Sequence, residues 1–307
     1  MDKRFETPSS PFTHCGASTQ RIMLDVIIAL LPATAAAIVI FGAPALVPIL
    51  SCVIAAVVSE FLFNAITHRK QSIGDLSAIV TGLLLGLNLS TNVPVWQCVL
   101  GSVFAIVFVK CLFGGLGHNF ANPAITARVF MLISFTQVMG GAMPKGVDLV
   151  TSATPLEVLS TGGEGLPSLL DMFLGVRGSA ATGEACVIAL AIGYIYLSIR
   201  RVIDFRVPLM IIGWTAVFAL LFDGLIKQQL TGSQLLLNAA SHVLSGGLIF
   251  GAIFMATDYA TSPNTFAGNC IFAFGIALLT VLIRVFASYP EGVSFAILIM
   301  NCVTPLI

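Results

Sequence analysis

IMLDVIIALLPATAAAIVIFG, residues 22–42, is an apolar run that contains a single charged side chain, Asp25. About 20 predominantly apolar residues in a helix are enough to span the roughly 30 Å hydrocarbon core of a bilayer. The stretch therefore predicts a transmembrane helix. Because similar runs recur along the chain, we expect several such helices.

The composition of the whole chain indicates the same class. Of 307 residues, 57% are hydrophobic and 9% are charged, and the mean hydropathy is +1.01. An average soluble domain carries about 25% charged residues, so this chain has too little polar surface to cover itself in water. We predict an all-α polytopic membrane protein with about ten transmembrane helices. Their approximate ranges are 22–42, 44–66, 74–90, 94–113, 124–140, 183–200, 207–226, 240–257, 267–287 and 290–305.

The basic residues predict the orientation. Lys and Arg accumulate on the cytoplasmic side of membrane proteins. With ten spans and a cytoplasmic N-terminus, ten basic residues fall inside, namely Lys3, Arg4, Arg21, Arg69, Lys70, Lys110, Arg128, Arg200, Arg201 and Arg206. Four fall outside, namely Lys145, Arg177, Lys227 and Arg284. We therefore expect both termini in the cytoplasm and the loop 141–182 on the outer face.

The two halves of the chain contain similar segments in the same order. The matched segments are TGLLLG (81–86) with SGGLIFG (245–251), Lys110 with Arg284, and ANPA (121–124) with YPEG (289–292). A repeat with an odd number of spans, here five, starts and ends on opposite sides of the membrane. We therefore expect the two copies to have opposite orientations, an arrangement typical of transporters. Glycine near helix starts is also common in membranes for other reasons, and the sequence leaves that alternative open.

These observations predict four regions. Residues 1–21 form a cytoplasmic N-terminal segment, and residues 22–140 form the first five-helix repeat. Residues 141–182 form the outer loop, and residues 183–307 form the second five-helix repeat.

Seven cysteines are scattered at about one per span, with no C-x-x-C pair. Iron–sulfur and zinc sites need clustered thiolates, so we expect no metal site in this chain by itself. One cysteine could still contribute to a site shared with a partner.

Three polar interruptions break the apolar pattern, at 113–124, 255–268 and 288–294. Non-helical backbone at membrane depth occurs only where it is buried in protein or lines a wet cavity. Charged residues at that depth are costly and usually functional. Asp258 is therefore the first candidate for an ion path, followed by Glu60 and Asp25. An ordinary surface turn remains the alternative for Asp258.

GVDLVTSATPLEVL (146–159) is a polar stretch within the outer loop. Thr154-Pro155-Leu156-Glu157 has the pattern of a capping box with proline at the first helical position. A helix N-terminus also attracts phosphate, so the Thr154 hydroxyl could be the attachment point of a phosphate-bearing cofactor. The two interpretations are compatible. No histidine lies nearby in the sequence to activate Thr154, and we expect no catalytic nucleophile here.

This stretch resembles the S/T-G-A-T flavinylation motif of RnfD and NqrB, which are membrane subunits of ion-pumping redox complexes. Here the motif is Thr151-Ser152-Ala153-Thr154, with Ser152 in place of the usual glycine. Four longer segments are also similar to the family, and with the motif they cover most of the chain from Gly74 onward. They are KCLFGGLGHNFANPA (110–124), RGSAATGEACVIALAIGYIYL (177–197), HVLSGGLIFGAIFMATDYATSPNT (242–265) and RVFASYPEGVSFAILIMNCVTPLI (284–307).

The resemblance, closest to RnfD, implies a subunit of the Rnf ferredoxin:NAD oxidoreductase complex in the bacterial cytoplasmic (inner) membrane. FMN would be joined through its phosphate to Thr154 by a flavin transferase, with Asp148, Ser152 and Ala153 beside the attachment point. This subunit would relay electrons while other Rnf subunits bind the substrates, so we do not expect it to be catalytic alone. A second, non-covalent flavin, riboflavin, is also implied, without assigned residues. We expect contact with the lipid bilayer and no nucleic-acid partner.

Three questions stay open at this point. The chain could instead be an NqrB-type subunit of a Na⁺-pumping quinone reductase. It could also be a small-solute channel without redox activity, because inverted repeats with broken helices suit solute transport. The Thr154 stretch argues against the channel. The sequence does not distinguish Na⁺ from H⁺ as the coupled ion.

Overall fold

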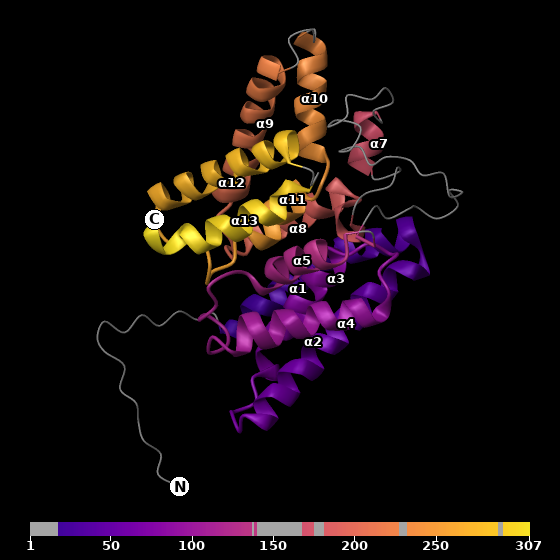
Figure 1. Ribbon diagram of the computed structural model, residues 1–307, viewed down its shortest axis with the longest axis vertical. Helices are drawn as coiled ribbons and strands as arrows, with labels where there is room; N and C mark the ends of the chain where they lie inside the picture. Colours follow the sequence, from indigo (N-terminus) through magenta and orange to yellow (C-terminus); the bar gives the residue numbers. More distant parts are fainter. Residues whose placement is uncertain (1–17, 137, 140–167, 175–180, 227–231, 288–290) are drawn as a thin grey trace.

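The computed structural model describes residues 18–136, 138–139, 168–174, 181–226, 232–287 and 291–307 (Figure 1). Every regular element within these ranges is helical, which confirms the predicted class. The α-helices and the two π-helical segments, η3 and η5, are α1 (Thr19–Phe41), α2 (Leu46–Ile66), α3 (Ser77–Leu87), α4 (Val95–Val103), η3 (Phe104–Cys111), α5 (Pro123–Ser134), α7 (Leu169–Leu174), α8 (Val187–Ile199), α9 (Arg206–Ile226), α10 (Gly232–Leu244), α11 (Leu248–Phe250), η5 (Gly251–Met255), α12 (Phe266–Phe286) and α13 (Gly292–Val303). Short 3₁₀ turns are η1 (Ala43–Ala45), η2 (Ile73–Asp75), η4 (Thr182–Glu184) and η6 (Thr304–Leu306).

Each of the ten predicted spans corresponds to an apolar helical segment, but the expected lengths are wrong for half of them. Among the described residues, four helices are long and apolar enough to cross a membrane, and α10 with α11 and η5 forms a fifth candidate that is bent by 55°. The other five apolar helices have 10–17 residues. A helix rises 1.5 Å per residue, so the 11 residues of α3 extend only about 17 Å.

The starts of α3 and α11 follow residues in the left-handed region of the backbone. Leu76, immediately before α3, has φ 65°, and Gly246 and Gly247, between α10 and α11, have φ 68° and 66°. A left-handed residue cannot continue a right-handed helix. Leu76 and the two glycines therefore interrupt the helices at these points. The sequence predicted the positions of such interruptions only approximately.

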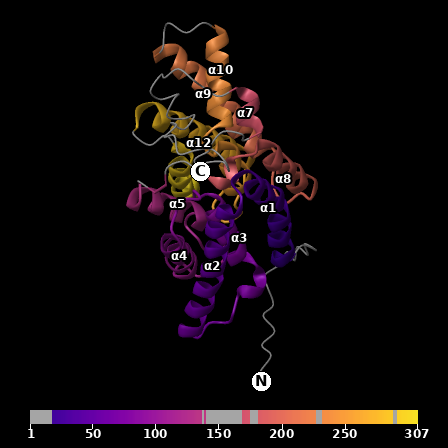
Figure 2. The same ribbon diagram turned by 90° about the vertical axis from the view of Figure 1, so that its right-hand side faces the viewer.

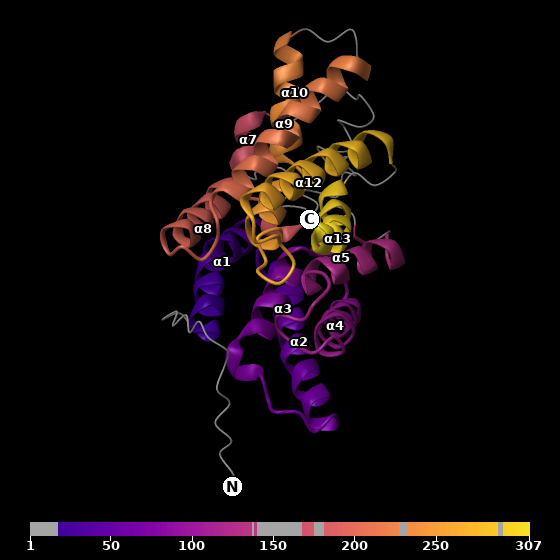
Figure 3. The ribbon, with the colours of Figure 1, turned by 90° about the vertical axis from the view of Figure 1, so that its left-hand side faces the viewer.

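The two halves of the molecule make equivalent contacts. α2 packs against α3 and α4, and α9 packs against α10 and α12. The halves meet where α1 packs against α8 and α5 packs against α13. Figure 2 shows α1 beside α8, and Figure 3 shows α13 next to α5. These contacts agree with two repeats related by an axis that passes between the halves.

The half-helices α3 and α11–η5 approach each other from opposite directions. Asn88, the C-cap of α3, contacts Met255, the last residue of η5, with 3.3 Å between Asn88 Nδ2 and Met255 Sδ. Both half-helices therefore end in the interior of the molecule. Backbone ends at this depth are tolerated because protein groups surround them.

The glycines of α3 allow it to pack closely against α2. A Cβ atom on Gly82 would lie 2.7 Å from the Cα atom of Val53, and one on Gly86 would lie 2.7 Å from the Cα atom of Ile49. Small residues are typical of close helix contacts in membrane proteins. The α2–α3 contact therefore depends on the absence of side chains at these positions.

We predict that Gly82→Ala lowers the stability of the protein, because the added methyl group collides with the α2 backbone. Overpacking of this kind costs about 1–3 kcal/mol. Gly74→Ala is the matched control, since a Cβ atom there meets nothing within 4 Å. Thermal unfolding in detergent should show a lower Tm for Gly82→Ala only. Equal Tm values for the two variants would contradict the close α2–α3 contact.

Candidate functional site

The residues of the predicted flavin attachment lie outside the described part of the chain. These are Asp148, Ser152, Ala153 and Thr154. The candidate for the ion path, Asp258, is described. Among the described residues, the candidate site therefore consists of interior residues around the half-helices α3 and α11–η5.

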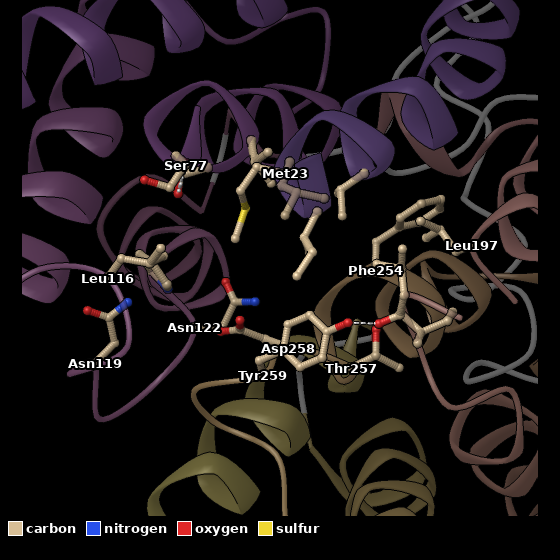
Figure 4. A pocket seen from close by; sticks show the side chains of 18 of the residues that line it. Met23, Ser77, Leu116, Asn119, Asn122, Leu197, Phe254, Thr257, Asp258 and Tyr259 are labelled. Carbon is tan, nitrogen blue, oxygen red and sulfur yellow. Dashed lines mark hydrogen bonds between the residues drawn. The ribbon is translucent and has the colours of Figure 1, made fainter. Parts of the chain in front are cut away.

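Asp258 lies in a turn and also lines a cavity. Its main-chain carbonyl accepts hydrogen bonds from the N–H groups of Thr261 and Ser262, and Thr261 Oγ1 donates to its carboxylate at 3.3 Å. Asp258 therefore forms a turn after η5. The same residue also lines a cavity, as Figure 4 shows.

This cavity, called the Asp258 cavity below, is partly open to the surface, and its space of about 720 Å³ includes the open part. Its walls come from α1, α3, α5, η5 and the segments that follow η3 and α8 (Figure 4). Most lining side chains are apolar, with a few convergent polar groups, which is the usual character of a small-molecule site. Asn119 Oδ1 is buried in the wall and has no hydrogen-bond partner among the described residues. The polar lining residues are Ser77, Thr81, Lys110, Asn119, Asn122, Thr257, Asp258 and Tyr259.

A buried ion pair holds the N-terminal end of α3 at the margin of this cavity. Lys110, on η3, is 1% exposed, and its Nζ lies 2.9 and 3.0 Å from the two carboxylate oxygens of Glu60 on α2. The same Nζ donates to Ser77 Oγ at 2.6 Å. Ser72 Oγ also donates to Glu60 at 2.5 Å. Removing one partner of a buried pair leaves an uncompensated charge, so this cluster fixes α2, η3 and α3 together.

A second buried cluster joins the two halves of the molecule. Arg128, on α5, donates from its Nη1 to Glu184 Oε1 of η4 at 3.1 Å. Its guanidinium also donates to Asn88 and to Glu291. It is 3% exposed. Since Glu291 precedes α13 and Glu184 precedes α8, one guanidinium connects helices of both repeats.

Arg284 stabilises the break between α10 and α11. Its guanidinium donates to the carbonyls of His242, Ser245 and Gly246, the last two at 2.9 and 3.2 Å. Cations are favourable near the C-terminal carbonyls of a helix. Arg284 and Arg128 carry two positive charges, and Glu184 and Glu291 carry two negative charges. The formal charges of these four side chains therefore sum to zero.

This cluster borders a smaller cavity of about 230 Å³, called the Glu184 cavity below. Glu184 Oε2 is buried at the cavity and has no hydrogen-bond partner among the described residues. The lining residues are Asn88, Arg128, Glu184, Gly246, Gly247, Gly251, Met255, Glu291, Val293, Ser294 and Ile297.

Three of these cations are buried, which the sequence analysis did not predict. It placed Lys110 and Arg128 on the cytoplasmic side and Arg284 on the outer side, and all three are at most 3% exposed. Their carboxylate and carbonyl partners lie on other helices, so local sequence did not reveal the pairing. Their positions next to or within apolar runs were the available signal, because charged residues at membrane depth pair with one another or with carbonyls.

The other two carboxylates named for the ion path are paired. Glu60 pairs with Lys110, as described above. Asp25 accepts hydrogen bonds from Tyr196 at 2.9 Å and from the Arg200 guanidinium at 3.1 and 3.3 Å. No described cation lies within 4 Å of the Asp258 carboxylate, which distinguishes it from both.

The described basic residues that are exposed lie at one end of the helices. They occur at the start of α1, after α2, after α8 and at the start of α9, and they are Arg21, Arg69, Lys70, Arg200, Arg201 and Arg206. The Asp258 cavity lies near the same end, since it is lined by Met23 of α1, two residues after Arg21 (Figure 4). The C-terminal Ile307 also lies there, beside Gly268.

Comparison with known proteins assigns the family. The NQR2, RnfD, RnfE family matches residues 6–307. The chain belongs to this family. It is 45% identical to the D subunit of the Na⁺-translocating ferredoxin:NAD⁺ oxidoreductase complex of Acetobacterium woodii, over 97% of this chain and 91% of the relative. It is 38% identical to the D subunit of the proton-translocating ferredoxin:NAD⁺ oxidoreductase complex of Clostridium ljungdahlii, over 99% of this chain and 93% of the relative. The D subunit of the ion-translocating oxidoreductase complex of Escherichia coli K12 is 33% identical to this chain, over 99% of this chain and 96% of the relative.

We predict that Lys110→Met destabilises this RnfD-family protein by about 3–5 kcal/mol, because it leaves Glu60 buried without its cation. The double variant Lys110→Met/Glu60→Gln should recover most of that loss, since it removes both charges. Denaturant or thermal unfolding of the purified single and double variants measures the difference. If the double variant is as unstable as Lys110→Met, the ion pair does not account for the stability of this region.

Proposed function

We propose that this chain is the membrane subunit of an ion-translocating ferredoxin:NAD oxidoreductase complex and that it relays electrons through FMN on Thr154. The observation that carries the proposal is the 45% identity to the D subunit of such a complex, over nearly the full length of both chains. The aligned region includes the membrane helices and the segments that form both interior clusters. The remaining subunits of the complex are the proposed partners, and the ferredoxin and NAD sites are proposed to lie on them.

The attachment of FMN to Thr154 rests on the sequence. Thr151-Ser152-Ala153-Thr154 followed by Pro155 is expected to begin a helix, where free N–H groups favour a phosphate. A covalent tether keeps a redox group in place at high effective concentration without relying on binding affinity. A flavin transferase would form this linkage during maturation.

We also propose that the Asp258 cavity holds the second flavin, riboflavin. The cavity is partly open and is lined mainly by apolar side chains with a few polar groups, which is the usual character of a small-molecule site. Asn119 lies among apolar lining side chains, and its Oδ1, which has no hydrogen-bond partner among the described residues, is ready to accept a hydrogen bond from a ligand (Figure 4). The flavin supplies the redox chemistry when bound, whereas these residues hold and orient it.

The proposed orientation places the end with the exposed basic residues in the cytoplasm of a bacterium. Six exposed cations lie at this end, and Lys and Arg accumulate on the cytoplasmic side. The Asp258 cavity then faces the cytoplasm, and the Glu184 cavity lies toward the outer face. Asp258 is proposed to contribute to the coupled ion path. The relatives differ in their named ion, Na⁺ in one and the proton in another.

A small-solute channel is the second candidate function, favoured by the half-helices that end inside the molecule. Inverted repeats with discontinuous helices are typical of transporters. Such a channel would have no need for a modified threonine, so the state of Thr154 distinguishes the two functions.

We predict that the protein matured in its own host carries FMN on Thr154. A denaturing gel should show a fluorescent band under ultraviolet light for the native protein and a dark band for Thr154→Ala. Ser152→Ala, which removes a neighbouring hydroxyl, should stay fluorescent. A dark native band, or fluorescence that persists in Thr154→Ala, would exclude this attachment point.

We predict that Asn119→Leu lowers the amount of riboflavin that copurifies with the complex, while the covalent FMN stays unchanged. Leucine has similar size but cannot accept the hydrogen bond offered at Asn119 Oδ1. Acid extraction followed by chromatography measures the released riboflavin. Asn92→Leu, at an exposed position away from the cavity lining, is the control. An unchanged riboflavin content in Asn119→Leu would place the flavin elsewhere.

A further inference from the structure

One face of α8 carries a stripe of exposed isoleucines, called the isoleucine stripe below. Its members recur every three or four residues and are Ile188, Ile192, Ile195 and Ile199. Residues with this spacing share one face of a helix. Figures 2 and 3 show the molecule from opposite sides, and both place α8 at its edge. Exposed apolar patches mark contacts with proteins or with a membrane, and in a membrane protein this face can contact acyl chains.

Two exposed arginines follow the isoleucine stripe. Arg201 lies in the loop between α8 and α9, and Arg206 is the first residue of α9. Neither forms an ion pair with a described residue, whereas Arg200, directly after α8, is paired with Asp25. The carboxylate of the loop, Asp204, accepts a hydrogen bond from the Arg206 N–H group at 3.1 Å and so caps α9. The loop therefore presents two guanidinium groups that described carboxylates do not compensate.

The guanidinium of Arg206 is stacked on two aromatic rings. Its Cζ atom lies 5.6 Å from the ring centroid of Phe205 and 5.6 Å from that of Phe266, the first residue of α12. Both rings are more than half exposed, so the stack lies at the surface of the molecule. A stacked guanidinium keeps the N–H groups at its edge free, and these groups match two oxygens of a phosphate. The geometry of Arg206 therefore suits a phosphate group.

The backbone of the loop is fixed by side chains from two other segments. Tyr194 of α8 donates from its Oη to the carbonyl of Phe205 at 2.7 Å. Tyr259, which follows η5, donates from its Oη to the carbonyl of Val202. Arg201 itself has φ 55°, in the left-handed region where glycine is the usual residue after a helix. The two arginines are thus presented by a loop with a defined conformation.

We propose that the end of α8 and the loop after it bind one anionic phospholipid. Its phosphate lies at Arg201 and Arg206, and an acyl chain lies along the isoleucine stripe. An acidic protein surface would compensate the arginines but would leave the stripe uncovered, so a lipid fits both features. A basic residue near an anionic membrane surface favours binding by about fivefold, and this charge term selects an anionic lipid over a lipid without net charge.

This inference goes beyond the proposed function and does not depend on it. It requires only that the chain lies in a membrane. Val202 and Ile203 of the same loop line the Asp258 cavity. The bound headgroup would therefore lie beside one wall of that cavity.

The test uses the chain purified with its partner subunits, in nanodiscs made of phosphatidylcholine. A small fraction of the lipid is a probe with a diazirine on one acyl chain and either a phosphatidylglycerol or a phosphatidylcholine headgroup. After illumination, mass spectrometry measures the labelling of residues 187–209. We expect the phosphatidylglycerol probe to label this segment at least about fivefold more strongly than the phosphatidylcholine probe, because at least one arginine acts on its charge.

Arg201→Gly should lower this labelling ratio at least about twofold, and Arg201→Gly/Arg206→Gln should bring it to about one, since each change removes one of the charges that select the lipid. Glycine adopts the left-handed backbone at position 201 without strain, so the single variant keeps the loop conformation and provides the test if the double variant does not assemble. Lys70→Gln is the matched control. It removes one exposed cation at the same end of the helices, after α2, and should keep the native ratio.

Four results would overturn the inference. The first is equal labelling of residues 187–209 by the two probes. The second is a native ratio in Arg201→Gly or an equal loss in Lys70→Gln. The third is an unlabelled segment in the assembled complex, because a partner subunit then covers the stripe. The fourth is displacement of the phosphatidylglycerol probe by excess inorganic phosphate but not by chloride at the same ionic strength, because the site then binds soluble phosphate.

Discussion

Charged groups inside a bilayer are tolerated only when other protein groups compensate them, and the interior of this protein is organised by that requirement. Lys110 is compensated by Glu60, and Arg128 by Glu184 and Glu291. Arg284 is directed at main-chain carbonyls at the end of α10. Each of these cations therefore has its partners on another helix or helix end. The charges stabilise the places where the helices are interrupted.

The interruptions in turn create the cavities. α3 is only 11 residues long, and α10 is separated from α11 by two glycines in the left-handed region. Continuous helices would fill this space with side chains and leave no room beside Asp258 or Glu184. Lys110 contacts the beginning of α3, and Arg284 contacts the break before α11, so each half of the chain has a buried cation beside an interrupted helix. This similarity agrees with the prediction that pairs Lys110 with Arg284 in two repeats.

Much of the fold was predictable because hydrophobic spans are local features. The run 22–42 became α1, and every other predicted span corresponds to an apolar helical segment. The lengths of α3, α5 and α13 were not predictable from hydropathy, because apolar residues such as Leu89 and Val93 continue past the helix ends as buried irregular chain. The position of Asp258 between two spans singled it out in the sequence, and the structure places it in the lining of a cavity. Arg128 was missed, since its partners Asn88, Glu184 and Glu291 are 40 to 163 residues away along the chain.

The most direct test of this account is the side of the membrane from which each cavity can be reached. Single cysteines replace Thr81 in the Asp258 cavity or Ser294 in the Glu184 cavity, in a protein whose native cysteines have been changed to serine or alanine. A small, membrane-impermeant methanethiosulfonate reagent is then applied to either side of oriented vesicles. The account predicts that Thr81→Cys is modified only from the cytoplasmic side and Ser294→Cys only from the outer side. Modification of both cysteines from the same side would contradict it.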